Sequence, residues 1–300
     1  MNVLAGPLRV PQDTSGLEQH EIRRTESHVT GSTGHLLFRR AWLPETPERI
    51  VILVHGYAEH SGRYEHVGSQ LASAGFAVHA YDQQGHGKSG GVRCHVRRFE
   101  HLVDDLEGFV AKVRAEHAPL PLFVVGHSMG GLVVGTYASQ RNPDVAGVVT
   151  SGAALARSED LSRGRILCAR LLRWLAPRLS LASGLDPEFL SRDPAVIQTY
   201  LEDPLVHQRI TTSLACEILS AMEHTASAAA QVRVPILLLH GEEDRLCPVS
   251  GSRDFFDRLT LSSRRLLTYP GLRHEIFNEP ERASVLNDLI DWIRNTEPGV

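Results

Sequence analysis

Short, continuously apolar runs alternate along the chain with longer stretches in which apolar residues recur every three or four positions. The runs at 50–54 and 122–125 fit strands buried on both faces, whereas the spacing within 99–116 fits an amphipathic helix. Such alternation builds a mostly parallel sheet with helices on both faces. The pattern predicts strands at 35–42, 50–54, 77–81, 122–125, 145–150, 235–240 and 265–269, and helices at 63–74, 99–116, 129–140, 250–259 and 280–294.

Two segments depart from this alternation. Residues 1–20 hold two prolines, two glycines and little apolar periodicity, and we predict a flexible N-terminal arm. Residues 157–207 contain no convincing strand, and four prolines divide them into short predicted helices. We therefore expect an α/β fold in which one sheet domain, residues 21–156 and 208–300, is interrupted by a helical cap at 157–207. The cap is expected over the carboxyl edge of the sheet, where open α/β folds bind ligands.

Composition narrows the class of protein. The 300 residues are 42% hydrophobic and 22% charged, which excludes global disorder. A net charge of −4 gives no reason to expect a nucleic acid partner. The four cysteines form no C-x-x-C pair, which favours a reducing compartment. Because the sequence shows no signal-peptide pattern and no apolar stretch near 18 residues, we expect a soluble, cytoplasmic protein.

The strongest chemical signal is at 126–130, which reads Gly-His-Ser-Met-Gly directly after a predicted strand and at the start of a predicted helix. This is the context that the G-x-S-x-G nucleophile motif requires. The turn is so tight that a Cβ two positions before or after the serine would collide with neighbouring backbone. We therefore predict that Ser128 is a nucleophile, held at a helix N-terminus above the sheet.

A serine hydroxyl needs a base, and in this arrangement the expected chain order is serine, acid, histidine. His274 is the only histidine after His240 and follows the last predicted strand, so we assign it as general base. The preceding strand is followed by three carboxylates at 242–244. Asp244 is our choice because it lies deepest in the turn, where it would hold the histidine tautomer. Glu243 is the alternative acid, and Glu242 is expected to be solvated.

An oxyanion hole needs two backbone donors beside the nucleophile. The backbone N–H groups of Tyr57, after the strand at 50–54, and of Met129, next to the serine, are the candidates. The alternative for Tyr57 is a plain core aromatic. Residues 82–89 lack phosphate-loop spacing and are predicted to form a structural turn, with Asp82 and His86 bonded internally. We expect no cofactor and no metal, since no zinc-type spacing occurs.

These motifs together resemble a known family. Residues 55–64, His-Gly-Tyr-Ala-Glu-His-Ser-Gly-Arg-Tyr, and the segments 82–89, 126–131, 244–247 and 271–275 look like those of the monoacylglycerol lipases, in the α/β-hydrolase superfamily. The resemblance runs from about residue 25 to 296 and includes the cap. It implies the α/β-hydrolase fold, the triad and the oxyanion hole assigned above.

The resemblance also implies a substrate site. Glu59 and Arg63 match positions associated in the family with the glycerol end of the substrate, and Tyr200 matches a cap tyrosine near the same pocket. One departure occurs three residues after His274, where this chain has Phe277 and the mammalian members carry a second histidine. Contacts to glycerol on that side are therefore open.

Residues 163–176 suggest a surface function. On a helical wheel Leu167, Leu171 and Trp174 lie on one side, with Arg170 and Arg173 on the other. Such a helix either rests in a lipid interface or buries its apolar side on its own domain. Leu172, Leu175, Cys168 and Arg163 complete the two sides.

The expected activity is cleavage of monoacylglycerol to fatty acid and glycerol through an acyl-enzyme. Its substrate would be a lipid monoester, with transient membrane contact through the cap and no obligate protein partner. The alternatives are a lysophospholipase, a broad carboxylesterase, an acyltransferase or a non-catalytic binding module. An intact triad argues against the last.

Overall fold

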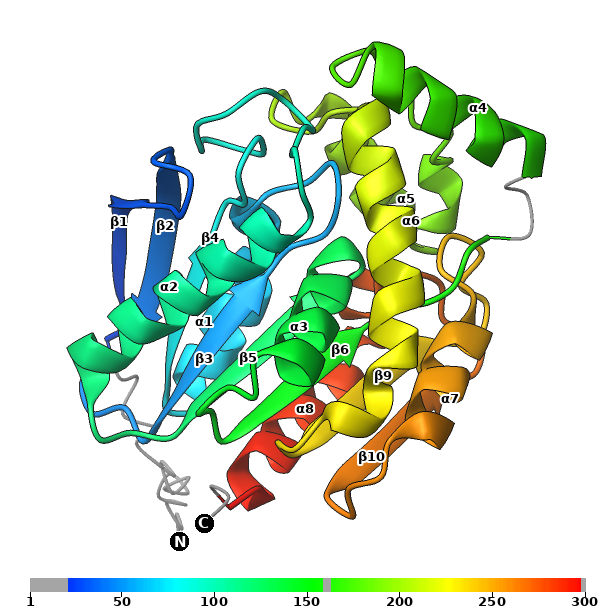
Figure 1. Cartoon of the computed structure of the whole chain (residues 1–300). Coiled ribbons are helices and arrows are strands. Elements are labelled where there is room, and N and C mark those ends of the chain that lie inside the picture. The colour runs from blue at the N-terminus through cyan, green and yellow to red at the C-terminus, as the bar shows by residue number, and fades with distance from the viewer. Residues whose placement is uncertain (1–20, 159–162, 298–300) are drawn as a thin grey trace, which may run out of the picture.

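The computed structural model describes residues 21–158 and 163–297, so the arm predicted at 1–20 lies outside the described residues. An eight-stranded sheet runs through the molecule in the order β1-β2-β4-β3-β5-β6-β9-β10 (Figure 1). β2 runs antiparallel to both of its neighbours, β1 and β4, and the strands from β4 to β10 in this order are parallel to one another. The strands are β1 Arg23–Thr30, β2 Leu36–Leu43, β3 Arg49–Val54, β4 Phe76–Tyr81, β5 Leu122–His127, β6 Gly147–Ser151, β9 Ile236–Gly241 and β10 Arg264–Tyr269.

Helices cover both faces of the sheet. The helices of the sheet domain are α1 Glu65–Ser73, α2 Glu100–His117, α3 Met129–Gln140, α6 Thr212–Ser227, α7 Val249–Arg258 and α8 Arg282–Asn295. Buried residues of α2, α3 and α7 form one core, and those of α1 and α8 form the other. The alternation of side chains along a strand divides them: Ile50 and Ile52 of β3 join the first core, and Val51 and Leu53 the second. The predicted parallel sheet with helices on both faces is confirmed.

The cap differs from its prediction in one element. A three-residue strand, β7 Ser180–Ala182, lies inside the segment expected to hold no strand, and it pairs antiparallel with β8 Arg209–Thr211. So short a strand leaves no period-two pattern to recognise, because its partner defines it. The cap also contains α4 Arg163–Leu175 and α5 Pro194–Glu202, and α6, which was not predicted, follows β8 directly.

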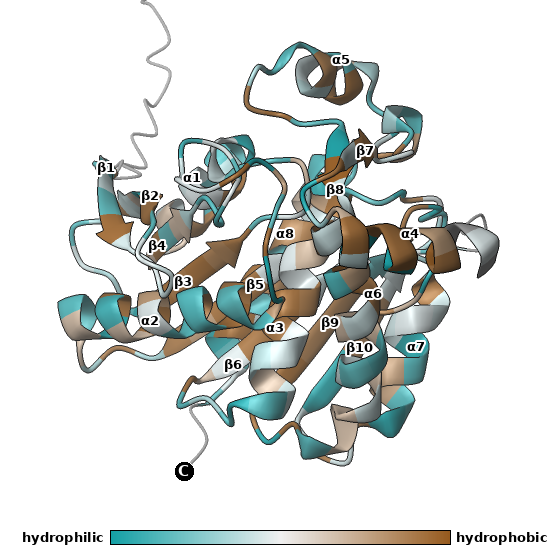
Figure 2. Cartoon of the chain, turned by 45° about the horizontal axis from the view of Figure 1, so that its top comes forward, coloured by the Kyte–Doolittle hydropathy of each residue, from teal (hydrophilic) through white to brown (hydrophobic). Residues whose placement is uncertain are grey.

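Helix α4 exposes its apolar side. Leu167, Leu171 and Trp174 are 71%, 60% and 84% exposed, while Ile166 is buried. Arg173, expected on the solvated side, instead forms an ion pair with Glu217 of α6. Of the two alternatives, the one in which this helix buries its apolar side on its own domain does not hold. Helix α4 lies against α6 (Figure 2), with Arg173 paired to Glu217, while Leu167, Leu171 and Trp174 stay in solvent.

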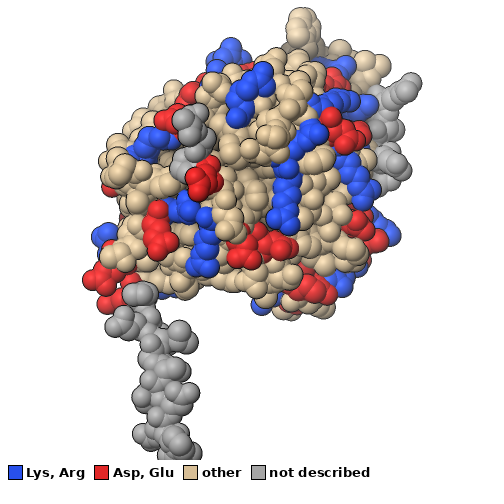
Figure 3. Space-filling model, turned by 90° about the horizontal axis from the view of Figure 1, so that it is seen from below, with Lys and Arg blue, Asp and Glu red and all other residues tan. Residues whose placement is uncertain are grey.

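The opposite end of the molecule has a different surface. Seen from below, the end that carries the amino termini of the parallel strands shows basic and acidic side chains interspersed (Figure 3). This face therefore forms no continuous surface of one charge. Among the described residues, no helix is both long enough and apolar enough to cross a bilayer.

Candidate active site

Ser128 stands at the sharp turn between β5 and α3, at the carboxyl edge of the sheet. Its backbone has φ 53° and ψ −117°, in the left-handed half of conformational space that a residue with a Cβ rarely adopts. The surroundings hold it there, because its N–H donates to the Ser151 carbonyl at 2.9 Å and its own carbonyl accepts from Leu132 and Ala154. This strained backbone conformation holds the Ser128 hydroxyl above the sheet, at the cavity.

The flanking glycines make this turn possible. A Cβ on Gly126 would overlap the carbonyl of Gly130, and one on Gly130 would overlap the carbonyls of Val54 and His55. Gly56 has a similar role nearer the pocket, since a Cβ there would lie 2.8 Å from Glu59 Oε1 and 3.1 Å from Ser128 Cβ. Gly56 thereby lets the Glu59 carboxylate approach the serine.

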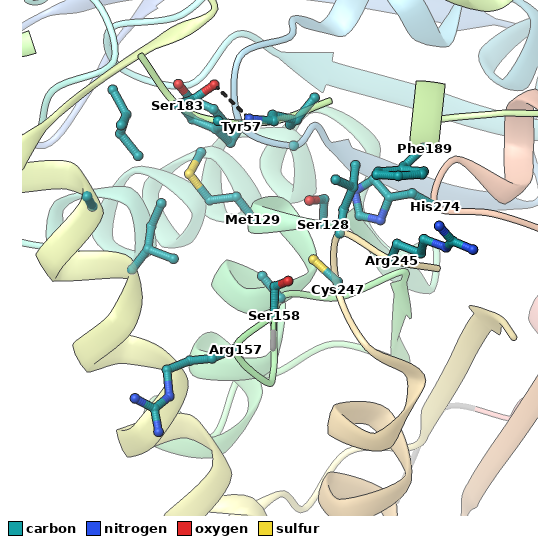
Figure 4. A pocket seen from close by; sticks show the side chains of 18 of the residues that line it. Tyr57, Ser128, Met129, Arg157, Ser158, Ser183, Phe189, Arg245, Cys247 and His274 are labelled. Atoms are coloured by element: carbon teal, nitrogen blue, oxygen red, sulfur yellow. Dashed lines mark hydrogen bonds between the residues drawn. The ribbon is translucent and has the colours of Figure 1, made fainter. Parts of the chain in front are cut away.

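His274 follows β10 and lies beside Ser128 in the pocket (Figure 4). Its Nδ1 donates to Asp244 Oδ2 at 2.7 Å, and both side chains are buried. Because the carboxylate accepts the Nδ1 proton, the neutral ring presents an unprotonated Nε2. Burial alone would lower the pKa of His274, but Asp244 raises it above its ordinary value, with smaller contributions from Glu275 and Glu59.

The turn after β9 fixes Asp244. Its Oδ1 accepts the N–H groups of Leu246 and Cys247, each at 2.9 Å, and its Oδ2 lies 3.2 Å from Nε2 of buried His240. Although burial favours the neutral acid, the two histidines hold the pKa of Asp244 well below its usual range. Glu242 and Glu243, the two neighbouring carboxylates, are exposed. The geometry thus supports the acid chosen from the sequence.

The loop after β3 is positioned by His55. Its Nε2 accepts the Gln83 N–H at 2.8 Å, so Nδ1 carries the proton and donates to the Gly56 carbonyl at 2.7 Å. In a trans peptide the carbonyl and the following N–H point in opposite directions. The bond to His55 therefore turns the Tyr57 N–H away from that ring. Met129 supplies a second free N–H as the first residue of α3.

A cavity of about 380 Å³ opens above these groups. One wall comes from α6, where Ala215, Ile218, Leu219 and Met222 repeat at the spacing of one helix face. Figure 4 shows Met129, Cys247 and Phe189 around Ser128 and His274. Polar groups converge elsewhere on the lining: Glu59, Tyr200 and Glu275. The cavity therefore combines a long apolar wall with a compact polar part.

The comparisons with known proteins agree with this site. The chain matches the family model described as "Serine aminopeptidase, S33" over residues 45–281. It is 39% identical over 272 residues to the monoacylglycerol lipase of Mycolicibacterium smegmatis, covering 90% of this chain and 97% of that protein. The chain belongs to the monoacylglycerol lipase family. It is also 33% identical to the monoglyceride lipase of Rattus norvegicus, covering 89% of each. The crystal structure of Paleococcus ferrophilus monoacylglycerol lipase has a TM-score of 0.77 at 36% identity, covering 92% of this chain and 100% of that one.

In this member of the monoacylglycerol lipase family, the site residues predicted from the sequence lie together, but one of them does not reach the cavity. Glu59 and Tyr200 line the cavity, but Arg63 does not. Its guanidinium lies behind the lining, bonded to Glu59 and Glu275 and placed 4.9 Å from the Tyr200 ring centroid. Phe277 is buried in the core under α8, away from the lining.

Sequence reasoning missed several residues of this family member's site. The positioning residue His240 and the pocket wall on α6 were not singled out, although the spacing 215, 218, 219, 222 was a signal for the latter. His55 was named only as part of a motif, and Glu275 only as a neighbour of His274. No local pattern marks either of them.

One group could hold a metal ion among the described residues, and it lies apart from the site. His79, Glu116 and His117 bring ligand atoms within 4.8 Å of one another. The two ring Nε2 atoms lie 2.9 Å apart in a hydrogen bond, and Arg39 donates to both oxygens of Glu116 at 2.9 Å. These ligand atoms are thus already paired within the protein, where β4 meets the end of α2.

Proposed function

We propose that the chain hydrolyses monoacylglycerol to a fatty acid and glycerol through an acyl-enzyme on Ser128. The observation that carries this is the hydrogen bond from His274 to Asp244, with Ser128 beside the His274 ring at a cavity that has an apolar wall and a polar part. Membership of the monoacylglycerol lipase family supports the same activity.

The chemistry follows from the protonation states. Nε2 of His274 takes the proton as Ser128 Oγ bonds to the ester carbonyl carbon, and the Tyr57 and Met129 N–H groups donate to the oxyanion. Cleavage of the ester C–O bond releases glycerol, which receives that proton. Water then gives a proton to Nε2 and attacks the acyl carbon, so that fatty acid leaves and Ser128 regains its proton.

The two parts of the cavity suit the two parts of the substrate. The acyl chain would lie along Ile218, Leu219 and Met222, where its transfer from water is favourable. The glycerol hydroxyls are donors, and the Glu59 carboxylate beside the nucleophile is a fitting acceptor. Tyr200 covers this end from the cap. Glu59 and Tyr200 are thus proposed substrate contacts, and Arg63 positions them from behind.

A substrate panel tests the activity. We expect the purified protein to cleave monoacylglycerols in preference to di- and triacylglycerols and to lysophosphatidylcholine, with Ser128→Ala as the blank. Faster turnover of lysophosphatidylcholine would make the protein a lysophospholipase. Formation of new esters in the presence of added alcohols would indicate acyl transfer. If a fluorophosphonate failed to label Ser128, the serine would not be a reactive nucleophile and the protein would be a non-catalytic binding module.

The cap is proposed to bring the enzyme into transient contact with a lipid surface. The exposed side of α4 carries Leu167, Leu171, Trp174 and Leu175, beside exposed Arg170. A helix with an apolar side, a tryptophan and flanking arginines can lie in the headgroup region. The inner side of α4 lines the cavity through Ile166 and Ala169, so a substrate leaving the surface would meet the pocket directly.

Removing two of these side chains should weaken binding to lipid. For Leu171→Ser/Trp174→Ser we expect the partition coefficient on phosphatidylcholine–phosphatidylglycerol vesicles to fall about tenfold or more, since each buried side chain contributes roughly 1.5–3 kcal/mol. Co-sedimentation measures it, with hydrolysis of a short, soluble ester as the test of an intact site. Leu36→Ser, which changes a leucine 56% exposed at the start of β2, is the matched control. Equal loss in both variants would contradict the role of α4.

A further inference from the structure

The Arg63 guanidinium is bonded to two buried carboxylates. Its NH1 donates to Glu275 Oε1 at 2.6 Å and to Glu59 Oε2 at 2.8 Å, and its NH2 donates to Glu275 Oε2 at 2.8 Å. Glu275 is fixed further by Asn278, which donates to Oε2 at 2.7 Å. Its backbone N–H donates to the Leu190 carbonyl in the cap at 2.8 Å. The pairing with Glu275 is the bidentate form that orients both partners.

The two carboxylates lie between Arg63 and the cavity. Glu59 and Glu275 line the cavity, both at most 4% exposed, whereas Arg63 does not line it. Burial opposes their ionisation, but Arg63 lowers the pKa of Glu59 and brings that of Glu275 to about 2. One cation against two anions leaves this part of the cavity with a net charge of −1. His127, also on the lining, is neutral because burial lowers its pKa to about 4.

We propose that Glu275 is a specificity-determining residue, which restricts the enzyme to esters of uncharged alcohols by screening Arg63 from the substrate. The proposal rests on the proposed ester hydrolysis. A glycerol hydroxyl can donate to the surplus carboxylate, but a phosphate on the same alcohol would bring a second anion into a site with low solvent access. Like charges brought together at such a site cost several kcal/mol. The exposed Arg157 and Arg245, which also line the cavity, are in contact with water and offset this little.

Glu275→Gln separates charge from shape. The amide keeps the size of the side chain and one acceptor for Arg63, while the charge of the cluster changes from −1 to zero. Three decanoyl esters are compared below their aggregation concentrations: 1-decanoylglycerol, its 3-phosphate, and the dimethyl triester of that phosphate, which is bulkier but uncharged. For the wild type we expect kcat/KM for the phosphate at least about 100-fold below that for decanoylglycerol. For the uncharged triester, kcat/KM should fall much less below that for decanoylglycerol.

In Glu275→Gln the ratio of kcat/KM for the phosphate to that for decanoylglycerol should rise at least about tenfold. Glu202→Gln, an exposed charge two residues after Tyr200, is the matched control and should leave the ratio unchanged. An unchanged ratio in Glu275→Gln, or equal rejection of the triester and the phosphate by the wild type, would overturn the proposal. The wild-type comparison stands alone if the variant does not fold. Absence of decanoylglycerol cleavage by the wild type would instead refute the proposed function.

Discussion

Replacing Ser128 by alanine should lower kcat for monoacylglycerol by about 10⁶-fold, the loss seen when the nucleophile is removed from a triad. The remaining groups would still bind substrate and stabilise an oxyanion, but no side chain could form the acyl-enzyme. Cys247 is the nearest alternative, since its thiol lines the same cavity beside Ser128 (Figure 4). Burial raises the pKa of that thiol well above its ordinary value, so it stays protonated and weakly nucleophilic.

Two measurements make the result for Ser128→Ala decisive. Steady-state hydrolysis gives the loss in kcat, and a fluorophosphonate should label the wild type stoichiometrically and the variant not at all. The thermal midpoint should change little, because alanine keeps the Cβ and with it the strained backbone at φ 53°. Substantial residual turnover that is abolished by a thiol reagent would assign the nucleophile to Cys247 and refute the mechanism.

The features that could be predicted from the sequence are those encoded locally. The apolar runs at 50–54 and 122–125 fall within β3 and β5, because a strand buried on both faces must be apolar throughout. The nucleophile turn was predictable for a similar reason: the backbone around Ser128 excludes any Cβ at Gly126 and Gly130. In both cases the constraint and the residues that meet it are neighbours in the chain.

What could not be predicted depends on contacts across long stretches of sequence. Arg63 and Glu275 are 212 positions apart, and nothing near either one indicates that the guanidinium turns away from the cavity. The helical wheel of α4 placed Leu167, Leu171 and Trp174 together, and they are exposed together, but only the position of α6 decides which side of the helix is covered. Glu217, in the unpredicted α6, draws Arg173 inward and leaves Leu171 and Trp174 in solvent.

Asp244→Asn should lower kcat by about 10⁴-fold while leaving the fold intact. Oδ1 is fixed by the N–H groups of Leu246 and Cys247, so the asparagine oxygen would stay there and its NH₂ would take the place of Oδ2. That NH₂ would face Nδ1 of His274 at the 2.7 Å contact. To accept from it, the histidine must move its proton to Nε2, the tautomer that is unable to take a proton from Ser128. His240 cannot accept a hydrogen bond from the new NH₂ instead, because its Nε2 already donates to the Cys247 carbonyl at 2.8 Å.

The pH dependence and a neighbouring variant distinguish this explanation from a loss of stability. Asp244 raises the pKa of His274, so its replacement should move the acid-side fall in kcat/KM to lower pH. The exposed Glu243→Gln removes one charge at the adjacent position and should leave both kcat and the pH profile unchanged. If Glu243→Gln loses activity and Asp244→Asn does not, the acid is Glu243, and the tautomer of His274 is set by a carboxylate that must first turn in from the surface.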